Sequence, residues 1–208
     1  RGLGLYAVPA SDPGVELDRL ESLDPTRRLY RVRFDTARGR RVGALRDAEE
    51  VLEEVLEVST ALLCAEMVGG MERVLETAVD HATTRFQFGR ANGSFQAVKH
   101  KAANMLIDFE GARTATRAAL ETLDDPKASR ADRTIAVSVA KAHASAAYVR
   151  TATESTQIQG GVGYTWEYDA HLYFRRAHSS SILLGDSSYH EERVARRVAL
   201  QLAEGRIQ

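Results

Sequence analysis

The sequence contains little cysteine and proline, almost no net charge and no long apolar run. Its 208 residues include 1 cysteine and 4 prolines, and its formal net charge is −1 at pH 7. The single Cys64 excludes an internal disulfide and fits a reducing, cytoplasmic setting. A charge this small gives no reason to expect nucleic acid or an anionic membrane as a partner. No apolar stretch reaches the length of a membrane span, because Glu66 interrupts the longest one.

Recognisable metal-ligand and nucleotide motifs are missing too. His171 and His178 are seven positions apart, and no cysteine or carboxylate pattern joins any of the 6 histidines. The sequence also contains no P-loop and no dinucleotide fingerprint ahead of a helix. We therefore predict no metal site. The composition is that of an ordinary globular protein with one sizeable core.

Two hydrophobic periodicities divide the chain. Residues 30–35 alternate apolar and charged side chains, which is typical of a half-buried strand, and residues 3–8 also have the character of a strand. We therefore predict that residues 1–44 form a β unit. Since its first strand has no natural start, we expect the chain to be part of a longer protein.

From residue 45 onward, apolar residues recur every three or four positions, which predicts amphipathic helices. Three long helices are expected, with apolar faces formed by Val51, Val55, Val58, Leu62 and Ala65, by Val98, Ala102, Met105 and Phe109, and by Ile135, Val139, Ala142, Ala146 and Val149. Turn-forming residues separate them at 90–94, 124–126 and 160–163. A last helix is expected from about Ser188, which has the capping-box spacing with Glu191. Long helices with short connections pack as antiparallel neighbours, so we predict a mainly α fold, an up-and-down helical bundle.

Two motifs resemble segments of the acyl-CoA dehydrogenase family. Arg85-Phe86-Gln87-Phe88-Gly89-Arg90, followed by Phe95-Gln96, is similar to the family's Arg-x-x-Phe-Gly segment. Gln157-Ile158-Gln159-Gly160-Gly161-Val162-Gly163-Tyr164 is similar to its Gln-Ile-x-Gly-Gly-x-Gly-Tyr stretch. The resemblance implies that residues 1–44 are the end of the family's middle β domain and that residues 45–208 are its C-terminal helical bundle domain.

The resemblance also implies an FAD-dependent oxidoreductase that converts an acyl-CoA to a 2,3-enoyl-CoA. In the family a carboxylate removes the α proton, and a hydride passes from the β carbon to the flavin. Positions that contact FAD are matched by Arg85, Gln87, Phe88 and Gln96, and the stretch that receives the ADP part of a neighbouring subunit's FAD is matched by Gln157, Gly160 and Gly161. Since family members assemble so that two subunits contact one FAD, the resemblance also implies an oligomer. Without the resemblance, we would favour structural roles, with Arg85 capping the end of its helix and Phe88 in the core; with both motifs, we favour FAD contact.

The position of the family's catalytic glutamate carries no carboxylate here. Counting from Arg176, residues 184–189 correspond to the family's Tyr-Glu-Gly-Thr-x-Gln, which assigns Gly185 to the base position and Ser187 to a flavin contact. Other family members carry the glutamate on the first bundle helix, at the position of Ser59. Asp186 is one residue late and one methylene shorter than glutamate, and a carboxylate there also suits a helix N-terminus.

Three hypotheses follow. In the first, the chain is a base-deficient subunit that completes a partner's FAD site. Residues 165–169 and 184–186 resemble the actinobacterial branch of the family, where paired subunits act on bulky steroid or other degradation-pathway thioesters. In the second, an active homo-oligomer uses Asp186 as its base. In the third, the chain is a helical interaction module that binds no flavin. We favour the first hypothesis.

Overall fold

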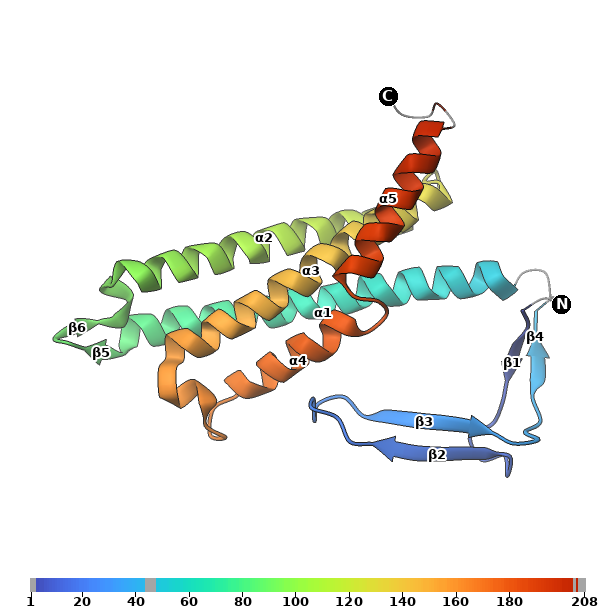
Figure 1. Cartoon of the computed structure of the whole chain (residues 1–208), viewed down its shortest axis with the longest axis horizontal. Coiled ribbons are helices and arrows are strands. Elements are labelled where there is room, and N and C mark those ends of the chain that lie inside the picture. The colour runs from blue at the N-terminus through green and yellow to red at the C-terminus, as the bar shows by residue number, and fades with distance from the viewer. Residues whose placement is uncertain (1–2, 44–47, 204, 206–208) are drawn as a thin grey trace. The chain divides into compact units, whose positions relative to one another are not determined.

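The computed structural model describes residues 3–43, 48–203 and 205, shown in Figure 1. The chain divides into two compact units, residues 1–56 and residues 57–208. The fold is mainly α, as predicted. The predicted domain boundary between residues 44 and 45 lies outside the described residues.

The first unit contains two antiparallel strand pairs. β1 (Leu5–Ala7) pairs with β4 (Arg40–Val42), and β2 (Val15–Leu20) pairs with β3 (Leu29–Phe34). Both strands expected from the sequence are therefore confirmed. The predicted half-burial is wrong, because every residue of β3 is exposed. Leu17 and Val32, which lie opposite each other, are 49% and 46% exposed. No second layer among the described residues covers their face of the ribbon.

The described residues also form five α-helices and four short connecting elements. The helices are α1 (Ala48–Thr84), α2 (Gln96–Asp124), α3 (Arg130–Gln159), α4 (Ala170–Ile182) and α5 (Ser187–Ala203). Between α1 and α2 lie β5 (Phe86–Gln87), β6 (Arg90–Ala91) and the 3-10 helix η1 (Asn92–Ser94), and between α3 and α4 lies the 3-10 helix η2 (Gly160–Tyr164). The breaks predicted between the long helices are thus confirmed. No helix in this part of the chain is long and apolar enough to cross a membrane.

Helix α3 is central to the bundle, because it packs against α2, α4 and α5. Its small side chains, among them Ala140, Ala144 and Ala147, are fully buried, which allows the neighbouring backbones to approach closely. Tyr148 of α3 fills the space over Gly70 of α1, where an added Cβ would lie only 2.3 Å from the tyrosine Oη. Figure 1 shows α2 and α3 as neighbouring antiparallel helices.

The apolar face predicted for α1 is wrong. Val51, Val55, Val58, Leu62 and Ala65 are all exposed. The core contains a different set of residues from the same helix, namely Ala61, Leu63, Cys64, Met67, Met71, Val74 and Ala78. The helix carries apolar residues around most of its circumference, so periodicity alone did not identify the buried side. Cys64 is buried, as expected, and burial raises the pKa of its thiol to about 12.

Candidate functional site

A tight hairpin follows the first bundle helix and contains three of the predicted site residues. β5 and β6 pair with Phe86 opposite Ala91 and Gln87 opposite Arg90, so Phe88 and Gly89 form a two-residue turn. Both turn residues have positive φ, +55° for Phe88 and +76° for Gly89. This conformation costs an aromatic residue energy, and such strain often marks a functional position. The Phe88 side chain is 91% exposed, so Phe88 is not a core residue of the bundle, which was its interpretation without the family resemblance.

The neighbouring polar residues of this segment are also accessible. Arg85 and Gln87 are exposed, and the Arg85 carbonyl accepts a hydrogen bond from the Asn92 amide at 2.8 Å, which closes the hairpin. Gln96 is exposed at the start of α2, with its Nε2 3.5 Å from His100 Nε2. The structure thus presents a cation, two amides and an aromatic ring on one short segment.

The glycine-rich turn after α3 contains the second group of predicted residues. Gly160 ends the helix with φ +65°, and neither Gly160 nor Gly161 has any atom within 4 Å of the place a Cβ would occupy. A ligand can therefore approach their backbone directly. Gln157 is exposed, and its Nε2 donates to Tyr164 Oη at 2.5 Å.

The bundle brings these two groups to the same end. The hairpin joins the end of α1 to the start of α2, and η2 follows the end of α3, which runs antiparallel to α2. Figure 1 shows both segments at that end of the helices. The predicted FAD-contacting residues of these two groups therefore lie at one end of the bundle. Ser187, the remaining predicted flavin contact, is the first residue of α5, and Gly185 and Asp186 lie in the connection between α4 and α5.

The loop at the predicted base position has an unusual backbone and no carboxylate before Asp186. Leu184 and Gly185 have φ of +60° and +101°. A Cβ on Gly185 would lie 2.4 Å from Cδ1 of Tyr189. The Gly185 amide donates a long hydrogen bond of 3.3 Å to the Ile182 carbonyl. A glutamate at position 185 would therefore require both the ring and the loop to move.

Asp186 and Ser187 are used to start helix α5. Asp186 is exposed, and its Oδ1 accepts from the Tyr189 amide at 2.8 Å, so Asp186 caps the helix in place of the predicted Ser188. Ser187 Oγ donates to the Ala142 carbonyl of α3 at 3.1 Å, which leaves only its oxygen lone pairs for a ligand.

The other nearby carboxylates also hold helices together. The family's second glutamate position is occupied by Ser59, which has no carboxylate and is half-buried on α1. Glu57 is buried, accepts from Thr134 Oγ1 at 2.6 Å and lies 3.7 Å from the Arg193 guanidinium, so it links α1 to α3 and α5. Glu66 binds the Arg176 guanidinium of α4 at 2.9 and 2.8 Å.

Two buried groups beside this loop were not among the predicted site residues. Lys141 and His190 are both completely buried. Lys141 Nζ reaches the Ser181 and Gly185 carbonyls, and His190 Nε2 lies 3.0 Å from the Leu184 carbonyl. Burial lowers the pKa of Lys141 to about 8 and that of His190 to about 4. The signal that could have found Lys141 is its position among the alanines of α3. The structure buries these alanines, and a lysine is unusual in such a place.

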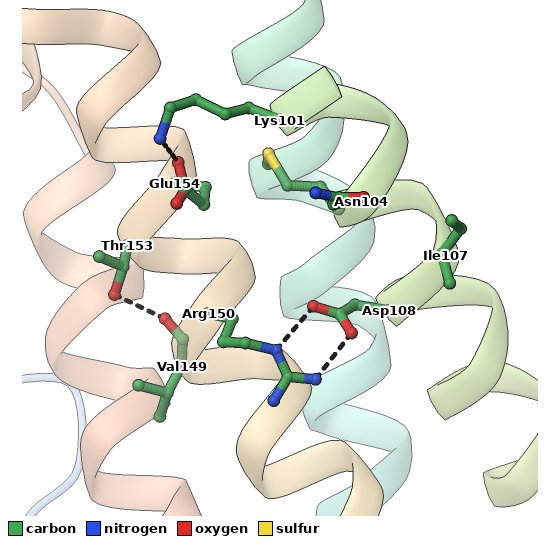
Figure 2. A pocket seen from close by; sticks show the side chains of 9 residues that line it. Lys101, Asn104, Ile107, Asp108, Val149, Arg150, Thr153 and Glu154 are labelled. Carbon is green, nitrogen blue, oxygen red and sulfur yellow. Dashed lines mark hydrogen bonds and ion pairs between the residues drawn. The ribbon is translucent and has the colours of Figure 1, made fainter. Parts of the chain in front are cut away.

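A cavity of about 450 Å³ lies between α2 and α3, and Figure 2 shows the side chains that line it. Its charges are paired across the two helices. Arg150 binds Asp108 through two hydrogen bonds of 3.0 and 2.7 Å, and Lys101 binds Glu154. None of the predicted site residues lines it. We therefore regard it as part of the helix–helix seam. In the described part of the chain, no three His, Cys, Asp or Glu residues are arranged to hold a metal ion.

Comparisons with known proteins show which protein family the chain belongs to. The family model for the acyl-CoA dehydrogenase C-terminal domain matches residues 37–199, so the chain belongs to that family. It is 36% identical over 165 residues to the acyl-CoA dehydrogenase IpdE2 of Mycobacterium tuberculosis, covering 78% of this chain and 46% of the relative. To FadE34 of the same organism it is 39% identical over 160 residues, covering 73% of this chain and 22% of the relative. The chain thus spans half the length of these relatives or less.

Solved structures with the same fold include a protein complex. The Tcur3481-Tcur3483 steroid ACAD, solved as a glycine-to-alanine variant, superposes with a TM-score of 0.86 at 28% identity, covering 96% of this chain and 53% of that one. The ChsE4-ChsE5 complex from Mycobacterium tuberculosis gives a TM-score of 0.82 at 31% identity, covering 94% and 52%. Butyryl-CoA dehydrogenase from Megasphaera elsdenii gives 0.88 at 23% identity, which bears on the fold alone.

The buried His190 makes stability depend on pH in a predictable direction. Because its pKa is lowered from 6.5 to about 4, the unfolded chain binds more protons than the folded chain between these values. The stabilisation from neutral His190 is therefore complete above pH 6.5 and is lost as the pH falls toward 4. We expect the His190→Gln variant to lose less stability than the wild type between pH 7.5 and 4.5, by on the order of 2 kcal/mol. Urea unfolding at both pH values measures this, and equal losses would contradict it.

Proposed function

We propose that the chain is the C-terminal part of an FAD-dependent acyl-CoA dehydrogenase subunit, which helps to complete a FAD site shared with a partner and has no base of its own. One observation carries this proposal. The predicted hairpin residues are exposed and the backbone at Gly160 and Gly161 is open, whereas the loop at the family's base position has no carboxylate free of a structural contact. In this proposal residues 1–44 are the end of the middle β domain and residues 45–208 are the C-terminal domain.

The exposed residues suit the chemistry of FAD. A guanidinium binds a pyrophosphate through paired charge-assisted hydrogen bonds, and Arg85 is accessible for this. The open backbone at Gly160 and Gly161 accommodates a close nucleotide. The Phe88 ring offers a flat apolar surface, and the amides of Gln87, Gln96 and Gln157 supply adaptable hydrogen bonds. When bound, FAD would act as the hydride acceptor.

Proton abstraction requires a carboxylate within hydrogen-bond reach of the α carbon. Gly185 has no side chain, and Glu57 and Glu66 are engaged between helices. Asp186 holds the first turn of α5. We therefore infer that a second dehydrogenase subunit brings the base. The naming of Tcur3481-Tcur3483 and ChsE4-ChsE5 as pairs supports a hetero-oligomer, and the word steroid in the first name supports a bulky acyl-CoA substrate.

The alternative is an active homo-oligomer with Asp186 as its base. The exposure of Asp186 favours this alternative, because the carboxylate is open to a ligand. Its contact with the Tyr189 amide opposes it, because a base that swings toward a substrate would give up the cap of α5. The two proposals differ in whether the Asp186 side chain takes part in the reaction.

Substituting Asp186 by asparagine decides between them. Asparagine caps helices about as well as aspartate, so Asp186→Asn should leave the loop intact. In the complex with a glutamate-bearing partner, we expect flavin reduction by a bulky acyl-CoA without oxygen to change by less than about twofold, since no proton passes to Asp186. Asp186→Ala, which also removes the cap, is the control for loss of helix stability. If Asp186→Asn stops flavin reduction while FAD stays bound, Asp186 is the base.

Substituting Arg85 by alanine tests the FAD site. We expect Arg85→Ala to weaken FAD binding by roughly ten- to a hundredfold in the complex, because a charge-assisted contact of about 1.5–3 kcal/mol is lost. Arg113→Ala is the matched control, since Arg113 makes a surface ion pair with Glu110 on α2. Titration of the apoprotein with FAD gives both affinities. An Arg85→Ala affinity equal to that of Arg113→Ala would assign Arg85 a structural role.

A further inference from the structure

A small cavity of about 230 Å³ lies between α1, the end of α3 and the start of α4. Its lining includes Gln159 of α3, Tyr173 of α4, and Glu167, Tyr168 and Asp169 of the connection before α4. Sites for drug-sized molecules and cofactors usually occupy about 300–1,000 Å³. This cavity is smaller, so it suits a single side chain or another small group.

Gln159 is 5% exposed and brings an unused hydrogen-bond acceptor to this cavity. Its Nε2 donates to Ser155 Oγ at 3.1 Å, and Ser155 Oγ donates its only proton to the Val74 carbonyl at 2.9 Å. Because Ser155 Oγ can then only accept from Gln159, the amide nitrogen faces Ser155 and the amide oxygen is left over. Gln159 Oε1 accepts no hydrogen bond from any residue that the structure describes. A buried acceptor of this kind calls for a donor from outside.

The other groups that line the cavity favour a cation as the source of that donor. Glu167 and Asp169 are exposed and add two carboxylates. Arg73 is the one cation among the described residues that line the cavity, and it already makes a surface ion pair along α1. The rings of Tyr168 and Tyr173 complete the lining, and aromatic faces attract guanidinium and ammonium groups. A positively charged group with several N–H donors therefore matches the cavity.

Exposed aromatic side chains lie on the same connection as the two carboxylates. Trp166 is 74% exposed and Tyr164 is 63% exposed. The Arg175 guanidinium lies 4.7 Å from the centroid of the Trp166 ring, and the His171 ring packs against that ring at 4.6 Å between centroids. The indole is therefore held in place although it faces solvent. Tryptophan, tyrosine and arginine are enriched at protein interfaces and dominate their binding energy, which favours a protein as the source of the cation.

We propose that this cavity receives the guanidinium or ammonium group of a basic side chain from a neighbouring subunit. The inserted group donates to Gln159 Oε1 and to the carboxylates of Glu167 and Asp169, and it lies against the rings of Tyr168 and Tyr173. The exposed aromatic residues of the same connection surround it and exclude water. This inference rests on the proposed function, because it requires a second subunit at this end of the bundle, next to the glycine turn.

The first test titrates the full chain with ethylguanidinium, the head group of an arginine side chain, and follows its amide NMR signals. We expect saturable shifts at the side-chain amide of Gln159 and at the backbone amides of residues 167–170. The neutral analogue N-ethylurea should bind at least about fivefold more weakly, because it lacks the charge. Absence of a saturable shift, or equal binding of the two probes, would overturn the inference.

Substitutions assign this binding to the cavity. Gln159→Leu removes the free acceptor, and the double variant Glu167→Gln/Asp169→Asn removes both charges while keeping the shape of the side chains. Each should weaken ethylguanidinium binding at least about fivefold, as measured at the backbone amides of residues 167–170. Glu110→Gln is the matched control, since the Glu110 carboxylate makes a surface ion pair on α2, away from the cavity. Binding by both variants equal to that of the control would contradict the assignment.

Sedimentation of the assembled full-length protein decides whether the cation comes from a subunit. We expect Glu167→Gln/Asp169→Asn to weaken subunit association at least about tenfold relative to Glu110→Gln, because a charge-assisted contact at the interface is lost. Association equal to that of the control, with ethylguanidinium still bound by the wild type, would show that the cavity takes a free small cation and would overturn the inference. An assembly that depends on the two carboxylates but never binds FAD would refute the proposed function and leave the inference standing.

Discussion

The buried ammonium group of Lys141 is the interaction on which the second half of the bundle depends. It joins α3 to the end of α4 and to the loop before α5, at residues 40 and 44 positions further along the chain. The alanines around it bring α3 close enough to its neighbours for a side chain to bind their backbone. Without Lys141, the Ser181 carbonyl of α4 and the Gly185 carbonyl of the loop would lose these hydrogen bonds.

The acidic residues near the loop also make structural contacts. Glu57 ties α1 to α3 and α5, Glu66 ties α1 to α4, and Asp186 starts α5. Each has a structural partner that a freely moving base would have to leave. The exposed hairpin is the opposite case, since Phe88 is held in a strained conformation and still faces outward. The hairpin side chains are therefore open to a ligand, whereas each of these carboxylates already has a structural contact.

Much of this architecture follows from the sequence, and the exceptions have physical reasons. Turn residues marked every break between the long helices, because glycine and proline are poor helix formers. Periodicity failed on α1, where Leu62 is exposed and Met67 buried, since a helix apolar on several sides has no single face to detect. The roles of Lys141 and His190 could not be predicted from the sequence, because their hydrogen bonds are to backbone carbonyls that only tertiary packing brings near. The positions of Gly185 and Asp186 in the family pattern came from resemblance, and their backbone contacts came from the structure.

The most direct test of the account is anaerobic flavin reduction by the full-length protein without a partner. The protein is purified alone, supplied with excess FAD and mixed with a bulky acyl-CoA, and the flavin absorbance is followed. A subunit that lacks a base cannot remove the α proton, so we expect no bleaching until a glutamate-bearing subunit is added. Full bleaching by the protein alone would contradict the account and show that this chain carries its own base.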